Sequence, residues 1–168
     1  PKRKSSSHKG CIGHVLIAGG NTGMAGAVIL AAKAALRTGA GLVTTVTVPQ
    51  NLEAISSAVP EAMVKTCDEH SIDKQFDETF VTGFTHVAVG MGLGQDEWSL
   101  KLLKNCAKMN RPILIDADAL NLVAKVGIND LGFSTTNPIV ITPHPGEAAR
   151  LLSTSNAVAT SDIQNNRF

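Results

Sequence analysis

The stretch GHVLIAGGNTGMAGAVILAAKAALRTGAGLVTTVTVP, residues 13–49, decides the fold of this chain. Its apolar run at residues 13–18 predicts a buried strand, and the alanine-rich segment at residues 27–38 predicts a helix that ends at a glycine. Residues 42–48, rich in Val and Thr, predict a second strand. A strand, a helix and another strand in this order are typical of a parallel sheet with crossover helices, so we expect an α/β fold.

The rest of the chain continues this alternation. We expect further strands at residues 62–66, 86–89, 112–116 and 138–141, and helices at residues 51–58, 96–108, 147–152 and 160–166. Residues 68–82 are polar and are expected to be irregular. No linker or repeat divides the sequence, which predicts a single domain over residues 1–168, and the polar, basic residues 1–8 are expected to be disordered.

Composition narrows the classes of partner. The chain has 15 Lys and Arg against 14 Asp and Glu, a net charge of +1 without a basic stripe, which argues against nucleic acid. The longest apolar runs, such as residues 25–35, are interrupted by glycine and lysine and are too short for a membrane span. Cys11, Cys67 and Cys106 are odd in number and form no Cys-x-x-Cys pair, which favours reduced thiols in a cytoplasmic protein.

Four loops follow predicted strands, at residues 19–26, 90–94, 116–118 and 142–147. In a parallel sheet such loops share one edge, where ligands bind, so we expect these four to meet. The first loop could hold an anion with its backbone amides, or its small residues could serve tight packing of helix on sheet. It fits neither the Gly-x-Gly-x-x-Gly pattern nor a P-loop, which disfavours a Rossmann dehydrogenase.

His144 is the most distinctive side chain of the last loop. Pro143 and Pro145 each fix a φ angle beside it, and Glu147 falls in the first turn of the helix that follows, where negative charge is favoured. The stiff backbone would hold the imidazole out at the carboxyl end of a strand. Two interpretations stay open, a ligand-binding histidine and an incidental histidine at a helix entry.

The two middle loops carry carboxylates and glycines. Asp116 and Asp118 could face one pocket and order water, a hydroxyl or Mg²⁺, but Asp118 is equally placed to cap a helix that starts at residue 119. The glycines of residues 90–94 could leave room for a bulky ligand or form a flexible turn before a helix that Asp96 caps. The remaining histidines, without metal-ligand spacing, are His8, His14, His70 and His86.

Taken in order, these segments resemble the ADP/ATP-dependent NAD(P)H-hydrate dehydratases. The segments that carry the resemblance are KG at 9–10, GHVLIAGG at 13–20, GMAGA at 23–27, ALRTGAG at 35–41, PEAM at 60–63, GMGLG at 90–94, DADAL at 116–120 and TPHPGE at 142–147. The resemblance implies a ribokinase-like α/β fold, with a mostly parallel central sheet and helices on both faces. It also implies repair of NADHX and NADPHX, in which a nucleotide phosphorylates the added hydroxyl and elimination restores the dihydronicotinamide.

The same resemblance assigns residues and cofactors. His144 would hydrogen-bond the altered nicotinamide. The hydrate site would be lined by Ala27 and by one or more of Gly90, Gly92 and Gly94. The supporting residues would be Asp116, Asp118, Thr142 and Glu147. ADP or ATP would serve as phosphoryl donor with Mg²⁺, although no metal ligand is assigned in this chain. Family members assemble as homo-oligomers, often tetramers.

Two departures from the family pattern limit what the chain is expected to do. Met91 stands where the family usually has proline, and the Gly-Ser-Gly-Asp segment with the catalytic aspartate would lie beyond Phe168. We therefore expect a sheet that is incomplete at its carboxyl end, in a truncated chain that carries the hydrate-binding part without a catalytic residue. The alternatives are another ribokinase-like small-molecule kinase and a non-catalytic nucleotide-binding or assembly module.

Overall fold

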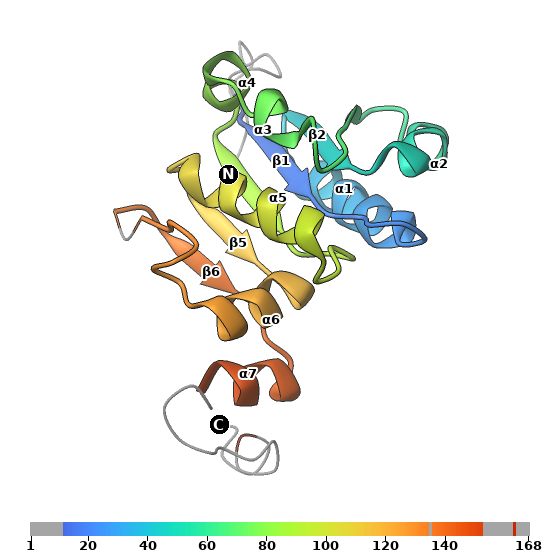
Figure 1. Cartoon of the computed structure of the whole chain (residues 1–168). Coiled ribbons are helices and arrows are strands. Elements are labelled where there is room, and N and C mark those ends of the chain that lie inside the picture. Colours follow the sequence, from blue (N-terminus) through green and yellow to red (C-terminus); the bar gives the residue numbers. More distant parts are fainter. Residues whose placement is uncertain (1–11, 135, 153–162, 164–168) are drawn as a thin grey trace.

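A computed structural model describes residues 12–134, 136–152 and 163 of the chain. The disorder expected at residues 1–8 and most of the helix expected at residues 160–166 lie outside these residues. Within the described part, six parallel strands form one sheet in the order β3-β2-β1-β4-β5-β6 (Figure 1). The strands are β1 (His14–Ala18), β2 (Leu42–Thr47), β3 (Met63–Thr66), β4 (His86–Val89), β5 (Ile113–Ile115) and β6 (Ile139–Ile141).

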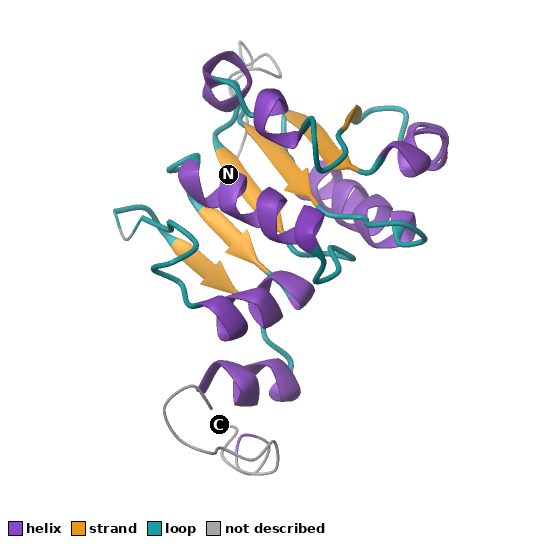
Figure 2. Cartoon of the chain, in the orientation of Figure 1, coloured by secondary structure: helices purple, strands orange, loops and turns teal. Residues whose placement is uncertain are grey.

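The helices connect these strands and cover both faces of the sheet, as expected. They are α1 (Ala25–Thr38), η2 (Pro49–Asn51), α2 (Leu52–Ala58), α3 (Ile72–Gln75), α4 (Glu78–Thr82), α5 (Glu97–Lys108), α6 (Ala117–Val126) and α7 (Pro145–Leu152). In Figure 2, α5 and α6 lie in front of the sheet and α1 lies behind it. Each helix expected between residues 51 and 152 is present, with ends that differ by one or two residues.

Alternation along the strands builds two cores. Leu16 of β1 packs in the core that α5 covers, and its neighbour Ile17 packs on the opposite face with Val28 and Ala32 of α1. All four side chains are almost fully buried. Such alternation is the period-2 geometry of a strand, and burial of both faces explains why β1 is a nearly continuous apolar run.

Helix α1 begins at Ala25, two residues before the predicted start, and ends where predicted. Gly39 follows it with φ +107°, and its N–H donates to the carbonyl of Leu36. This left-handed conformation is the usual glycine stop of a helix. The glycine therefore turns the chain into β2, whose Leu42 pairs in register with His14 of β1.

The expectation that residues 68–82 are irregular is wrong, because two short helices lie there. Asp77 caps α4, since its carboxylate accepts from the N–H of Phe80 at 2.8 Å. Asp68 accepts in the same way from the N–H of Ser71, just before α3. Side-chain caps of this kind satisfy the free amides of a first turn, so a polar segment can hold helices of four or five residues.

A row of apolar side chains crosses the face of the sheet opposite α5. Ile17 pairs with Ala88, Ala88 with Leu114, and Leu114 with Val140, so these four side chains lie in register across β1, β4, β5 and β6. Val140, at the β6 end of the row, is 53% exposed. On this face, α1 packs against the sheet at the β1 end of the row, and a groove remains beside it over β4 and β5.

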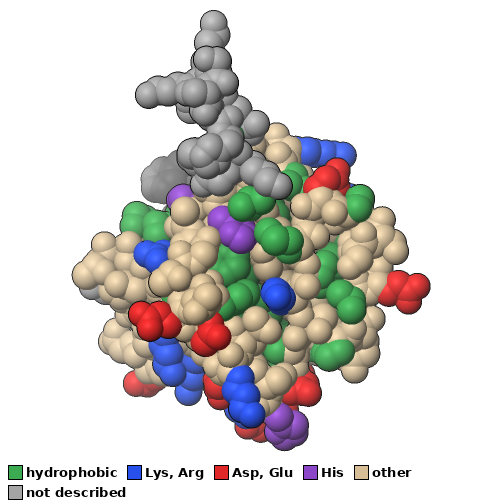
Figure 3. Space-filling view, turned by 90° about the horizontal axis from the view of Figure 1, so that it is seen from above, with side chains coloured by type: hydrophobic (Ala, Val, Ile, Leu, Met, Phe, Trp, Pro, Cys, Tyr) green, Lys and Arg blue, Asp and Glu red, His purple; other side chains and the backbone are tan. Residues whose placement is uncertain are grey.

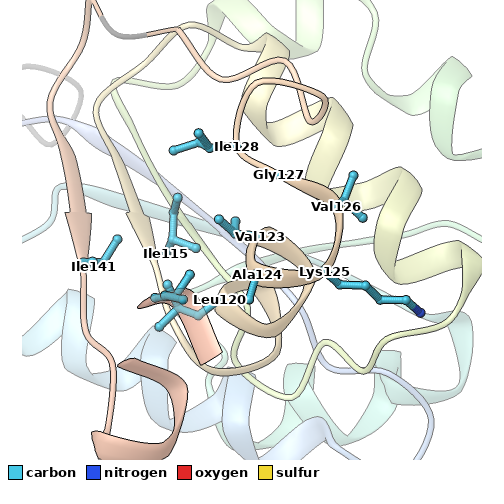
Figure 4. Close-up of a pocket in the computed structure, with 10 residues that line it drawn as sticks. Ile115, Leu120, Val123, Ala124, Lys125, Val126, Gly127, Ile128 and Ile141 are labelled. Carbon is cyan, nitrogen blue, oxygen red and sulfur yellow. The ribbon is translucent and has the colours of Figure 1, made fainter. Parts of the chain in front are cut away.

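A second apolar cleft, of about 490 Å³, lies on the opposite face between α6, β5 and β6 (Figure 4). Its lining includes Ile115 and Ile141 of the strands and Leu120 and Val123 of α6, and the side chain of Lys125 extends away from it.

Figure 3 views another side of the molecule, where side chains of both charges are interspersed among hydrophobic ones. Among the helices of the described residues, none combines the length and hydropathy required to span a bilayer.

Candidate functional site

The first and second loops lie side by side at the carboxyl ends of β1 and β4. The N–H of Gly20 donates to the carbonyl of Met91 at 3.0 Å, and the N–H of Asn21 donates to the carbonyl of Gly92 at 2.7 Å. A third bond runs from the N–H of Gly90 to the carbonyl of Ala18 at 3.1 Å. These bonds confirm that residues 19–26 and 90–94 meet at one edge of the sheet.

The glycines of residues 90–94 are required by close packing of the protein on itself. A Cβ at Gly90 would lie 1.8 Å from the carbonyl oxygen of Asp116, and a Cβ at Gly92 would lie 3.0 Å from the Cβ of Ala27. A Cβ at Gly94 would lie 2.9 Å from the side-chain nitrogen of Asn21. Protein atoms therefore lie where side chains at these three positions would be, which favours close packing of the loop over room left for a ligand.

The first loop uses its amides internally. The N–H groups of Gly19, Gly20, Asn21 and Thr22 donate to Val46, Met91, Gly92 and the side-chain oxygen of Asn21. A Cβ at Gly19 would also lie 2.3 Å from the carbonyl oxygen of Met91. Of the two interpretations of this loop, these contacts favour tight packing over an anion cradle at these four amides.

A polar network that runs from exposed Asp96 to buried Ser99, beneath the loops, was not predicted. The side-chain amide of Asn21 donates to the carbonyl of Leu93 at 3.1 Å and to the carboxylate of Asp96 at 2.7 Å. Ser99 donates to the same carbonyl at 2.6 Å, and its N–H donates to Asp96, which caps α5 as expected. The Asp-x-x-Ser spacing at residues 96–99 is the sequence signal that could have located this network.

Asp96 is held as a carboxylate by these contacts. Partial burial raises the pKa of its carboxyl, but the hydrogen bonds from Ser99 and Asn21 outweigh this effect and keep the pKa below its usual value.

Two further donors hold the first loop from beneath: Thr47 and Asn51 each donate to the carbonyl of Gly20 at 2.6 Å. The loop backbone is therefore fixed by side chains of β2 and η2 as well as by residues 90–94.

Asp116 and Asp118 have separate partners. Asp116 accepts from the hydroxyl of Thr142 at 2.7 Å, and Asp118 accepts from the N–H of Gly94 at 2.9 Å. The expectation that Asp118 caps a helix is wrong, because α6 begins one residue earlier at Ala117 and Asp118 lies in its first turn. The Asp116 carboxylate instead joins the third loop to the fourth, and the Asp118 carboxylate joins the third loop to the second.

A groove of about 520 Å³ lies beside these loops, between α1 and the back of β4 and β5. It brings together three of the predicted site residues, Ala27, Asp116 and Thr142. Its other lining residues are apolar: Val15, Ile17, Leu30, Ala31, Ala34, Ala35, Ala88, Met91 and Leu114. The arrangement could hold a flat apolar group against the sheet, with one carboxylate and one hydroxyl at its end.

His144 lies at the start of α7, where its side chain is 60% exposed. Its Nε2 is 3.1 Å from Oε1 of Glu147, and its Nδ1 accepts from the N–H of Gly146 at 3.0 Å. Glu147, which is 6% exposed, falls in the first turn of the helix as predicted. The histidine is therefore presented at the sheet edge and is oriented by two neighbours.

The other described histidines lie away from this edge. His14 is structural: its ring nitrogens bond the carbonyl of Gly83 and the hydroxyl of Thr44, and burial lowers the pKa of its imidazole. His70 and His86 are exposed. Among the residues that the structure describes, no three His, Cys, Asp or Glu side chains are grouped to hold a metal ion.

A family model described as NAD(P)H-hydrate dehydratase matches residues 15–167, which include all four loops. The chain belongs to the NAD(P)H-hydrate dehydratase family. The resemblance that the loop motifs predicted is thereby confirmed. The family's members are ADP/ATP-dependent, and the described sheet and helices have the family's ribokinase-like arrangement.

Individual relatives agree with this assignment. The "Bifunctional NAD(P)H-hydrate repair enzyme Nnr" of Escherichia coli is 44% identical over 160 residues, 95% of this chain and 29% of the relative. The crystal structure of the ADP/ATP-dependent NAD(P)H-hydrate dehydratase from Bacillus subtilis, co-crystallized with ATP/Mg²⁺, matches with a TM-score of 0.79 and 29% identity. A ribokinase-like superfamily protein from Enterococcus faecalis matches with a TM-score of 0.78 and 29% identity.

The chain is shorter than these relatives. It spans about a third of the Escherichia coli protein, of which it covers 29%. Nearly all of it aligns with the two solved structures, 99% and 98% of the chain, but these alignments cover 55% and 57% of the respective structures. The match therefore shows the family of this chain and does not by itself show the activity of a whole dehydratase.

Proposed function

We propose that this chain binds the hydrated nicotinamide nucleotides NADHX and NADPHX. It thereby takes part in their nucleotide-dependent dehydration to NADH and NADPH. The observation that carries the proposal is the family match over residues 15–167, because it includes the four loops that meet at one sheet edge. Their mutual hydrogen bonds give the edge a defined backbone before any ligand arrives. Such preorganisation lowers the ordering cost of binding.

Most of the residues assigned by the resemblance have a physical role in this proposal. Ala27 lines the groove and keeps it open, because a larger side chain there would fill it. His144 offers an exposed imidazole to the altered nicotinamide. The glycines of residues 90–94 act through their backbone, by letting the second loop pack tightly, and Asp116 with Thr142 orders the floor between β5 and β6.

The phosphoryl donor and its metal lie outside what we assign to the described residues. The amides of residues 19–22 are occupied internally, and among the described residues no three metal-ligating side chains are grouped, so we assign none of these residues to ADP, ATP or Mg²⁺. We therefore derive no catalytic step through them. We further propose a cytoplasmic homo-oligomer whose dehydration reaction uses ADP or ATP as phosphoryl donor with Mg²⁺.

Thermal unfolding of the 168-residue chain tests this function. NADPHX, intact NADPH, ADP and ATP are added separately, because a ligand that binds the folded state raises the melting temperature. We expect NADPHX to raise it more than NADPH, and His144→Gln to abolish that difference. His70→Gln, which changes an exposed histidine away from the loops, is the matched control and should leave it intact.

Each other result has a defined meaning. No shift with NADPHX in a folded chain would overturn the proposed binding function. Equal shifts with NADPHX and NADPH would indicate a pocket that ignores the hydration of the ring, as expected of a general nucleotide-binding module. A shift with ADP or ATP alone would overturn the proposed hydrate binding and favour a nucleotide-binding module.

A further inference from the structure

The ring of His144 has a defined tautomer. The N–H of Gly146 donates to Nδ1 at 3.0 Å, so Nδ1 must carry a lone pair rather than a proton. A neutral imidazole has one protonated nitrogen, and here that nitrogen is Nε2. Nε2 lies 3.1 Å from Oε1 of Glu147, so its proton is donated to the carboxylate.

Glu147 is itself fixed at both oxygens. While Oε1 faces the ring, Oε2 accepts from the backbone N–H of His144 at 2.9 Å. This is the glutamate half of a capping box, in which the third helical residue accepts from the N–H of the residue before the helix; the histidine ring accepts from the N–H of Gly146 instead of that of Glu147. The carboxylate is 6% exposed, and Arg150 anchors α7 to α6 by donating to Asn121 at 2.6 Å.

We propose that Glu147 is a positioning residue, which holds His144 as the neutral Nε2–H tautomer and makes the ring a hydrogen-bond donor toward its ligand. This inference rests on the proposed function only for the identity of the ligand. A ligand can take over the Nε2–H only with an acceptor, such as a carboxamide or hydroxyl oxygen. Glu147 would stay in place during the exchange, because its other oxygen remains bound to the backbone of His144.

The substitution Glu147→Gln isolates this role. Glutamine has the same length but one acceptor oxygen, whereas Glu147 accepts from two donors, the N–H and the Nε2–H of His144. The amide NH₂ must therefore oppose one of these donors. If it faces the ring, it favours the Nδ1–H tautomer, which in turn opposes the N–H of Gly146, so neither tautomer is satisfied.

Nitrogen-15 NMR of histidine-labelled chain at pH 8 tests the tautomer directly, since an ordinary histidine is neutral there. His144→Gln identifies the signals of His144 by their loss. We expect the wild type to show protonated Nε2 and unprotonated Nδ1, and Glu147→Gln to show a mixture of tautomers. Glu78→Gln, which removes an exposed first-turn carboxylate from α4, is the matched control and should leave the His144 signals unchanged.

Binding separates this inference from the proposed function. If Glu147 positions the ring, Glu147→Gln loses most of the thermal shift that NADPHX gives to the wild type, while circular dichroism shows an unchanged helix content. A wild-type Nδ1–H tautomer, or an undiminished hydrate shift in Glu147→Gln, would overturn the positioning role. No hydrate shift in the wild type would overturn the proposed function instead, and the NMR result would still decide the tautomer.

Discussion

Replacement of Gly90 by alanine is the sharpest test of how the loops are assembled. Gly90 has φ +123°, and a Cβ there would lie 1.8 Å from the carbonyl oxygen and 2.8 Å from the carbonyl carbon of Asp116. The backbone conformation costs about 1–3 kcal/mol for a residue with a side chain. Displacing packed backbone costs about 1–3 kcal/mol more. We therefore expect Gly90→Ala to lower the free energy of unfolding by about 2–6 kcal/mol.

Two other glycines separate the contributions. Gly23 also has a positive φ, +81°, but a Cβ there meets nothing within 4 Å, so Gly23→Ala should cost only about 1–2 kcal/mol. Gly26 lies in α1, also with open space, and Gly26→Ala should stabilise the chain by about 0.4–1 kcal/mol. The three variants therefore rank by the crowding and the φ angle at each site.

Urea unfolding followed by circular dichroism measures these free energies, provided that the slope with denaturant is the same for each variant. We expect Gly90→Ala to lose more stability than Gly23→Ala by about 1–3 kcal/mol, because only Gly90 faces packed backbone. Equal losses would refute it, because they would mean that the carbonyl of Asp116 moves aside at no cost. A loss from Gly26→Ala would contradict the assignment of open space beside α1.

Three further predictions concern the cores and the cap of α5. Asp96→Ala should lower the free energy of unfolding by about 0.5–2 kcal/mol at pH 7. Folding lowers the pKa of the Asp96 carboxyl, so its contribution to stability is present above the unfolded pKa of about 3.9 and is lost as the pH falls through the lower folded pKa. The unfolding curves of the two proteins should therefore converge in acid. Burial raises the pKa of the Cys67 thiol to about 11 and also raises the pKa of the Cys106 thiol. In a Cys11→Ser variant, neither thiol should therefore react with a disulfide reagent at pH 8 until urea unfolds the chain. Rapid reaction of the native protein would contradict their burial. Leu103→Ala should lower the free energy of unfolding by about 2–5 kcal/mol, because this leucine of α5 is fully buried in the core, and a loss below about 1 kcal/mol would show that the core relaxes around the gap.

The sequence predicted the elements well where they are built from continuous local patterns. The strands after residue 13 are short runs of apolar residues and threonine, interrupted by a lysine in β3, and each lies where it was expected. The parallel direction followed from the helices between them, because a parallel pair requires a crossover. The cap of α5 by Asp96 was likewise readable, since a cap involves residues only three positions apart.

The sequence misled where a residue's partner comes from another loop. Asp118 has the position of a capping residue, but its carboxylate bonds the N–H of Gly94, 24 residues away. The alternate glycines of residues 90–94 suggested space, but that space is filled by Asp116, Ala27 and Asn21. Composition alone did not indicate the short helices between residues 68 and 82, since polar side chains serve equally in loops and in caps.

The family, the α/β class and the residues of the four loops were therefore determined by the sequence itself, because local periodicity, glycine and proline act on the backbone nearest to them. Only the tertiary structure decided which of these residues touch. Asn21 reaches the carbonyl of Leu93 across 72 positions, and Thr142 reaches Asp116 across 26. Such contacts exist because the sheet brings distant strand ends to one edge, where each polar group takes the nearest partner that satisfies its hydrogen bond.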